Sequence, residues 1–438
     1  MRKSVLILLI MLGSGICVLA AEPPRKLTLA ECLQVAEQQH PDLAAARGLI
    51  TEARAQVKAA RSGLLPHLDT GGSYTRQSYN YAATPGTPPR LVQLFSNGEG
   101  LSNAPYYYGG LNISQTLYDF GQTKGQVRRA EADYATAQQN LQRVHDLVYL
   151  NVRQAYYGVL AAEEILQARK EAVASQQKHL DQVQAFHEVG TRPKIDVTQQ
   201  GVALASAQLD LRQAEENLDV ARAALATAMG IPIDQAPEPV NNLGEVRDPG
   251  SLAALLSEAE QQRPDIAGLR DRIFAAQADI IVARSAFRPN LSLASFFNYR
   301  SLQLPLIYNW SLGSIVAQSL FEGGARHAHL AAAQAEEEVA KANLTSSVQK
   351  VRQEVFTDYA DLQVAKDKIA LSQKAEAEAK ENLELAEGRY QSGYGNIIEL
   401  TDAQYLLTNT RVQTIVSRYD YQMAAASLDV AVGRTPAQ

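Results

Sequence analysis

The segment YYGGLNISQTLY (residues 107–118) and the residues that follow it decide the fold of this sequence. Leu111, Ile113 and Leu117 occupy alternate positions among polar neighbours, and a period of two is typical of a β-strand with one apolar face. The next long segment, 122–189, is rich in Ala, Gln, Glu and Leu and contains no proline. At 1.5 Å per residue it predicts a helix of roughly 100 Å. The sequence therefore joins strands to helical rods, whereas a chain of 438 residues would ordinarily form several globular cores.

Charged residues are scarce in the segments that predict strands. Residues 66–121 and 289–323 hold 15 of the 29 aromatic residues but only 7 of the 88 charged residues. We predict four strands, at about 68–77, 107–118, 291–300 and 308–321. The shorter two have the ~9–11 residues that a tilted strand needs to cross a bilayer.

Aromatic residues cluster where these strands end, as they do in the interfacial girdles of membrane strands. The expected girdle consists of Tyr106, Tyr107, Tyr108, Tyr299, Tyr308 and Trp310. Four strands cannot close a barrel, and open edges are not tolerated in hydrocarbon. Two copies of the chain would supply eight strands and three copies twelve. The alternative is a water-soluble β-sandwich flanked by helices.

The chain repeats itself, which predicts a duplicated architecture. The motif at 41–44 (PDLA) recurs at 264–267 (PDIA), and that at 117–119 (LYD) recurs at 320–322 (LFE). The offset between repeats falls by 20 residues inside the Pro- and Gly-rich stretch 82–105, which we therefore interpret as an exposed loop. The expected order is a first repeat (21–230) with a coiled coil at 122–229, a linker (231–250), a second repeat (251–433) with a coiled coil at 325–432, and a short tail (434–438).

The coiled-coil prediction depends on heptad spacing on the return helix of each repeat. In the first repeat, every seventh residue from Val197 to Leu225 is apolar, with alanines at the companion positions. In the second repeat, Thr414 and Tyr421 interrupt the leucines, so we expect a looser seam there. The core stripe of an ordinary helical bundle is the alternative interpretation.

The first 20 residues predict a secretory signal peptide. A basic start at Arg2 and Lys3 precedes an unbroken apolar run, which is shorter than the ~20 residues of a membrane-spanning anchor. Lipidation at Cys17 is disfavoured because Ile16 stands where a bacterial lipoprotein signal has Gly or Ala. No later stretch reaches 18 apolar residues, so a membrane-spanning protein would cross the bilayer without helices.

Composition disfavours two other classes of function. A formal net charge of −6 is unlike that of a nucleic-acid binder, which normally has an excess of basic residues. The seven histidines are scattered, and His327 and His329, two positions apart on a helix, would point to different faces. We therefore expect no enzyme activity, no cofactor and no metal site.

The chain resembles the TolC-like outer-membrane efflux proteins over essentially its whole length after the signal. The resemblance rests on LTLAECLQVAEQQHPDLAAAR at 27–47, LLPHL at 64–68, LYDFG at 117–121 and EVGTRPKIDV at 188–197. It implies a mainly α fold with a trimeric 12-stranded β-barrel in the outer membrane of a Gram-negative bacterium, and a long periplasmic α-helical tunnel. It also implies an exit duct for efflux or type I secretion, joined to an inner-membrane transporter by a periplasmic adaptor protein.

The resemblance also assigns roles to residues near the two helix-to-helix turns. It implies adaptor-contacting tips at Gly190, Thr191, Arg192, Pro193, Gly393, Tyr394, Gly395 and Asn396. It implies a gate residue at Tyr390 and an acidic pore constriction at Glu399 and Asp402, which share a helix face because they are three apart. Some relatives have an arginine latch where this chain has Gly395, so the closed state must use other contacts here. A soluble periplasmic coiled-coil scaffold without a pore is the alternative function, and the sequence does not identify the cargo.

Overall fold

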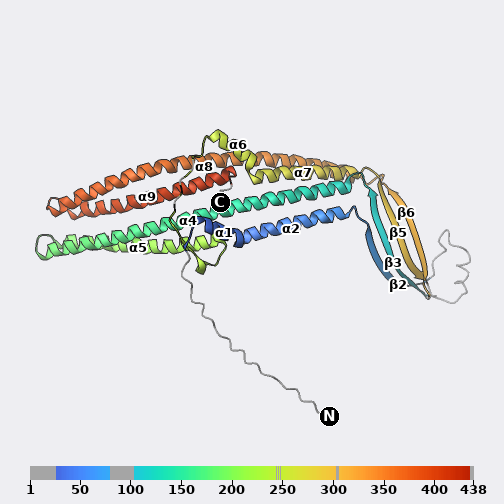
Figure 1. Cartoon of the computed structure of the whole chain (residues 1–438), viewed down its shortest axis with the longest axis horizontal. Helices are drawn as coiled ribbons and strands as arrows, with labels where there is room; N and C mark the ends of the chain where they lie inside the picture. The colour runs from blue at the N-terminus through green and yellow to red at the C-terminus, as the bar shows by residue number, and fades with distance from the viewer. Residues whose placement is uncertain are drawn as a thin grey trace, which may run out of the picture. The chain divides into compact units, whose positions relative to one another are not determined.

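The computed structural model describes residues 26–78, 103–242, 244, 246, 248–301 and 305–434. The predicted signal peptide and nearly all of the predicted loop 82–105 lie outside these residues. The helices and strands, in chain order, are β1 (Lys26–Leu27), α1 (Leu29–Gln39), α2 (Pro41–Ser62), β2 (His67–Ser78), β3 (Asn103–Tyr118), α4 (Gln122–Glu188), α5 (Lys194–Met229), η1 (Ile233–Gln235), β4 (Glu238–Pro239), α6 (Leu252–Gln262), α7 (Pro264–Ser285), β5 (Asn290–Ser301), β6 (Ile307–Ala317), α8 (Ala325–Gln391) and α9 (Ile397–Val432) (Figure 1).

The chain divides into two compact units. The tip unit comprises the chain up to Gln38 together with Val152–Glu245 and Glu378–Ile415. The strand unit comprises Gln39–Asn151, Val246–Ala377 and the chain from Val416 onward. Helices α4, α8 and α9 contribute residues to both units.

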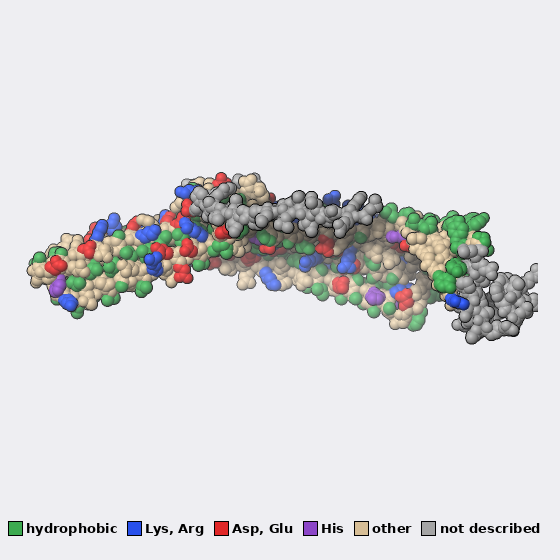
Figure 2. All heavy atoms as spheres, turned by 90° about the horizontal axis from the view of Figure 1, so that it is seen from below, with side chains coloured by type: hydrophobic (Ala, Val, Ile, Leu, Met, Phe, Trp, Pro, Cys, Tyr) green, Lys and Arg blue, Asp and Glu red, His purple; other side chains and the backbone are tan. Residues whose placement is uncertain are grey.

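The strand unit contains an antiparallel sheet with the strand order β2-β3-β5-β6 (Figure 1). Its register aligns Leu111 with Phe297 and Phe297 with Trp310, so that one apolar row crosses three strands. These side chains are 44%, 42% and 70% exposed, although apolar groups of this size are usually buried in water-soluble proteins. Figure 2 shows hydrophobic side chains gathered over the strands with few charged ones among them, while charged side chains are spread over the helices. The sheet therefore presents an apolar face.

The core of the strand unit forms where four helices meet. Leu255 of α6, Ile266 of α7, Val355 of α8 and Val432 of α9 are fully buried in one hydrophobic cluster. Arg263, only 2% exposed, anchors this cluster because its Nη1 donates both to the carbonyl of Ala431 and to Glu354.

The tip unit contains two helical hairpins and a small two-stranded parallel sheet. The buried Tyr156 of α4 donates its hydroxyl to the carbonyl of Val240, next to the β1–β4 pair, at 2.6 Å. A second hydrophobic cluster joins Val183 of α4 to Tyr390, Ile397 and Leu400 of α8 and α9. This cluster lies beside both helix-to-helix turns and positions the candidate site.

The observed strands correct two bounds of the predicted ones. The strand predicted for 308–321 ends at Ala317, because its pairing partner β5 begins at Asn290. Strand β3 begins at Asn103, within the predicted loop, because β2 extends to Ser78 and pairs with it.

The predicted linker and tail contain described residues with defined structure and contacts. The linker predicted for 231–250 contains η1 and β4. In the predicted tail, Arg434 forms an ion pair with Glu258 at 2.7 Å. None of the helices within the described residues is long and apolar enough to cross a membrane.

Candidate functional site

The first hairpin turns between α4 and α5 at residues 189–193. Gly190 has φ 77°, in the left-handed region that glycine adopts without steric cost. The backbone N–H and the hydroxyl of Thr191 both donate to the carbonyl of Phe186, at 3.0 and 2.8 Å. Gly190, Thr191 and Pro193 are exposed, whereas Arg192 is partly buried. The turn therefore projects three of its four predicted tip residues into solvent.

The second hairpin turns between α8 and α9 at residues 392–396. Gly393 has φ 82°, and the N–H groups of Tyr394 and Gly395 both donate to the carbonyl of Arg389. Asn396 caps α9, because its Oδ1 accepts from the N–H of Glu399 at 2.8 Å. Gly393, Tyr394 and Asn396 are exposed, Tyr394 by 87%. Gly395 is buried, which separates it from the other predicted tip residues.

Tyr390, the predicted gate residue, contacts the other hairpin at two points. Arg192 places its guanidinium 4.3 Å from the centre of the Tyr390 ring, and its Nη2 donates to the Tyr390 carbonyl at 2.6 Å. The Tyr390 hydroxyl donates to Oδ2 of Asp196 at 3.4 Å. Tyr390 and Asp196 are buried, with exposures of 3% and 7%. We call these three residues the hairpin tie.

Burial raises the pKa of the Tyr390 hydroxyl, and the charge of Asp196 adds to the shift, while Arg192 opposes it. A raised pKa favours the protonated phenol, which is the form that donates to a carboxylate. The contribution of the Tyr390 hydroxyl to the stability of the folded state is therefore fully present below the ordinary tyrosine pKa. It is lost as pH rises through the raised value.

The two predicted constriction residues lie on α9 just after the second turn. Asp402 is exposed and Glu399 is partly exposed. Arg389 of α8 places Nε 3.2 Å from Oε1 of Glu399. The structure therefore places Tyr390, Glu399 and Asp402 at one end of the second hairpin, together with Arg389, which the sequence interpretation missed. Its position, ten residues before Glu399 across a glycine turn, was the available signal.

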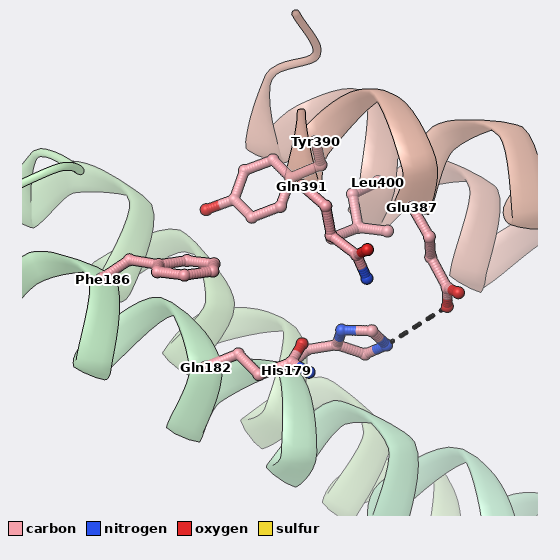
Figure 3. A pocket seen from close by; sticks show the side chains of 7 residues that line it. All are labelled: His179, Gln182, Phe186, Glu387, Tyr390, Gln391 and Leu400. Carbon is pink, nitrogen blue, oxygen red and sulfur yellow. Dashed lines mark ion pairs between the residues drawn. The ribbon is translucent and has the colours of Figure 1, made fainter. Parts of the chain in front are cut away.

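A cavity of about 230 Å³ opens between α4 and α8 next to the hairpin tie. It is lined by His179, Gln182, Phe186, Glu387, Tyr390, Gln391 and Leu400. In Figure 3 the rings of Phe186 and Tyr390 lie near each other, while His179 and Glu387 pair across the helices, with Nε2 3.5 Å from Oε1. His179 and Glu387 therefore add a second polar link between the hairpins.

The predicted aromatic girdle lies in the strand unit. Tyr299 of β5 pairs in register with Tyr308 of β6, and both are exposed, as is Trp310. Tyr106, Tyr107 and Tyr108 are only partly buried. Tyr107 lies 5.2 Å from Tyr74 of β2, centre to centre. The register thus places these aromatic residues on neighbouring strands.

His327 and His329 both lie near the start of α8. Among the described residues, no three His, Cys, Asp or Glu side chains are grouped so that they could hold a metal ion. His327 stacks edge-on against Phe287 at 5.0 Å, and His329 is exposed.

Residues 32–231 and 255–434 match the outer membrane efflux protein family. The chain belongs to this family.

Individual relatives agree over most of the chain. The cation efflux system protein CusC of Escherichia coli K12 is 28% identical over 401 residues, which cover 90% of this chain and 83% of CusC. The outer membrane protein OprJ of Pseudomonas aeruginosa is 26% identical, over 88% of this chain and 79% of OprJ. A crystal structure of CusC superposes with a TM-score of 0.81 at 25% identity, covering 94% of this chain and 93% of that one.

The same fold occurs in more distant solved structures, including the Campylobacter jejuni outer membrane channel CmeC, at a TM-score of 0.81 and 22% identity, covering 92% of this chain and 85% of that one. Family membership makes this outer membrane efflux protein a transport protein of the Gram-negative outer membrane with a periplasmic extension.

Proposed function

We propose that three copies of this chain form a gated exit duct of a tripartite efflux or type I secretion system, through which substrate passes passively. Each copy would contribute β2, β3, β5 and β6 to one 12-stranded barrel, because the two outer edges of the sheet need partners within a bilayer. The exposed apolar row through Leu111, Phe297 and Trp310 would face lipid. Tyr106, Tyr107, Tyr108, Tyr299, Tyr308 and Trp310 would form the interfacial girdle.

One observation carries the proposed gate: exposed Asp402 and partly exposed Glu399 lie on α9, in the same hairpin as Tyr390. In a trimer they would place six carboxylates around one periplasmic constriction. Rings of carboxylates attract cations and restrict the passage of anions. The hairpin tie would hold the two hairpins of each chain together in the closed state. It would replace the arginine latch that some relatives have at the position of Gly395.

The exposed turn residues of both hairpins are proposed to contact a periplasmic adaptor protein, which in turn joins an inner-membrane transporter. Arg192 and Gly395 are weaker candidates for direct contact, because the guanidinium of Arg192 is engaged with Tyr390 and Gly395 is buried. Relatives named for cation efflux and for pyoverdine export are similarly close, at 28% and 25% identity. We therefore propose that the inner-membrane partner sets the cargo.

The constriction is tested by replacing both acidic residues. Glu399→Ala with Asp402→Ala is expected to raise single-channel conductance in planar bilayers and to weaken block by multivalent cations, because the carboxylates both narrow and charge the opening. The unsubstituted protein, recorded in the same lipid and salt, is the control. If conductance and cation block are both unchanged, these residues do not form the constriction. Recovery of the protein in a soluble periplasmic fraction without detergent would instead support the scaffold alternative.

A further inference from the structure

Arg389 is a basic group built into the second hairpin next to the acidic residues. It lies in the last turn of α8, and Glu399 lies in the first turn of α9. A cation near a helix C-terminus and an anion near an N-terminus are each favoured by the helix dipole. Because α8 ends and α9 begins at the same turn, these two favourable charges lie close together and form an ion pair at 3.2 Å.

The backbone of the turn fixes the main chain of Arg389, whose side chain is 59% exposed. The carbonyl of Arg389 accepts from the N–H groups of Tyr394 and Gly395, at 3.0 and 2.9 Å. A Cβ at Gly395 would lie 3.0 Å from the Tyr390 nitrogen and 3.1 Å from the carbonyl carbon and Cβ of Arg389. These distances are shorter than ordinary van der Waals contact. Glycine at 395 thus lets the turn close around Arg389 and leaves the guanidinium beside Glu399.

The charged side chains that contact one another at this turn partly offset each other. From the first hairpin, Arg192 and Asp196 both contact Tyr390 and have opposite charges. Within the second hairpin, Arg389, Glu399 and Asp402 sum to −1 per chain. Three chains would then give a constriction with a net charge of −3, although its six carboxylates alone would give −6.

We propose that Arg389 is a selectivity-determining residue of the pore, which offsets the charge of Glu399 and leaves Asp402 as the uncompensated anion. This inference rests on the proposed constriction. The preference of the pore for cations then depends on the summed charge of Arg389, Glu399 and Asp402. The positive charge of Arg389 limits that preference.

The test is the reversal potential of the purified full-length trimer in a planar bilayer under a KCl gradient. Arg389→Gln uncovers three negative charges, so the cation-to-anion permeability ratio should rise at least about twofold. Glu399→Gln leaves Arg389 uncompensated and should lower the ratio, as should Asp402→Asn. Arg389→Gln combined with Glu399→Gln restores the original net charge and should return the ratio to that of the unsubstituted protein.

Arg411→Gln is the matched control. Arg411 also lies on α9 and forms an exposed ion pair, with Glu171 at 2.6 Å, but away from the turn, so its loss should leave the reversal potential unchanged. If Asp402→Asn shifts the reversal potential, Arg389→Gln does not, and the double variant behaves like Glu399→Gln, then Arg389 plays no part in selectivity. If none of the variants shifts it, including Asp402→Asn, the proposed constriction itself is wrong.

Discussion

Arg192 makes two different contacts with one tyrosine, and both cross from the first hairpin to the second. The guanidinium lies over the Tyr390 ring and donates to the Tyr390 carbonyl. A cation–π contact and a charge-assisted hydrogen bond each contribute on the order of 1 kcal/mol. A motion that separates the hairpins must break both contacts.

We therefore expect Arg192→Ala to weaken the closed state and to raise single-channel conductance in planar bilayers. Arg192→Lys is the matched control. It keeps the charge but loses the planar group that stacks on the ring, so it should give an intermediate conductance. Equal conductance for the alanine variant and the unsubstituted protein would show that the hairpin tie does not limit opening.

At the scale of single residues, the sequence predicts well which helix carries a given side chain. It predicts poorly which other side chain that residue contacts. Glu399 and Asp402 share α9 because helical spacing is regular. Arg192 and Tyr390 are 198 positions apart, and their contact depends on how two hairpins pack, which no local pattern encodes. Gly395 illustrates the same limit, because only the folded turn shows that a side chain there would press on the backbone of Arg389.

At the scale of helices, the two hairpins differ in how they bury polar groups. Nε2 of the fully buried Gln200 of α5 donates to the carbonyl and to Oε1 of Gln176 on α4, at 3.3 and 2.5 Å, while Oε1 of Gln200 has no hydrogen-bond partner among the described residues. Gln404 of α9 is 4% exposed, and within the described part of the chain neither atom of its amide group has a hydrogen-bond partner. An unsatisfied buried amide costs about 1–3 kcal/mol. The buried amide of Gln404 therefore lowers the stability of the second hairpin.

Gln404→Leu is expected to stabilise the second hairpin by about 1–2 kcal/mol, because it replaces an unsatisfied amide with an apolar group of similar size. Hydrogen exchange of the backbone amides around 397–410 should slow accordingly.

Gln200→Leu provides the comparison in the first hairpin. It removes two hydrogen bonds and leaves Gln176 without this partner, so exchange in α5 should quicken. If the two substitutions change exchange in the same direction, the hydrogen bonds of these two amides do not determine the local stability of the helices.

The helices were easier to place from the sequence than the ends of the strands. Helix α4 ends at Glu188, next to Gly190, whose positive φ a long helix cannot continue. Strand ends depend on pairing instead. Leu320 and Phe321 continue the apolar character of β6 but are 87% and 86% exposed beyond the end of its ladder with β5. A prediction based on composition therefore places the end of this strand at 321, beyond Ala317, where its pairing with β5 ends.

At the scale of the whole molecule, we expect the sheet to determine assembly. In the described part of the chain, β2 and β6 each pair on one side only. Unpaired strand edges promote association between chains, and in a bilayer they must be satisfied by another strand. In a trimer, the edge strands β2 and β6 of neighbouring chains would pair with each other. The trimer would also bring three copies of Asp402 together at the proposed constriction.

The most direct test of this account is Asp402→Cys in the full-length protein, recorded in a planar bilayer. Three thiols at one constriction would bind Cd²⁺, so micromolar Cd²⁺ should block the current and EDTA should restore it. The control is the unsubstituted protein, whose Cys32 is buried. The predicted result is reversible block of the variant at a Cd²⁺ concentration that blocks the unsubstituted protein much less, because thiolates bind Cd²⁺ more tightly than carboxylates do. A current unaffected by Cd²⁺ in the variant would contradict the claim that these hairpins form the gate of a trimeric pore.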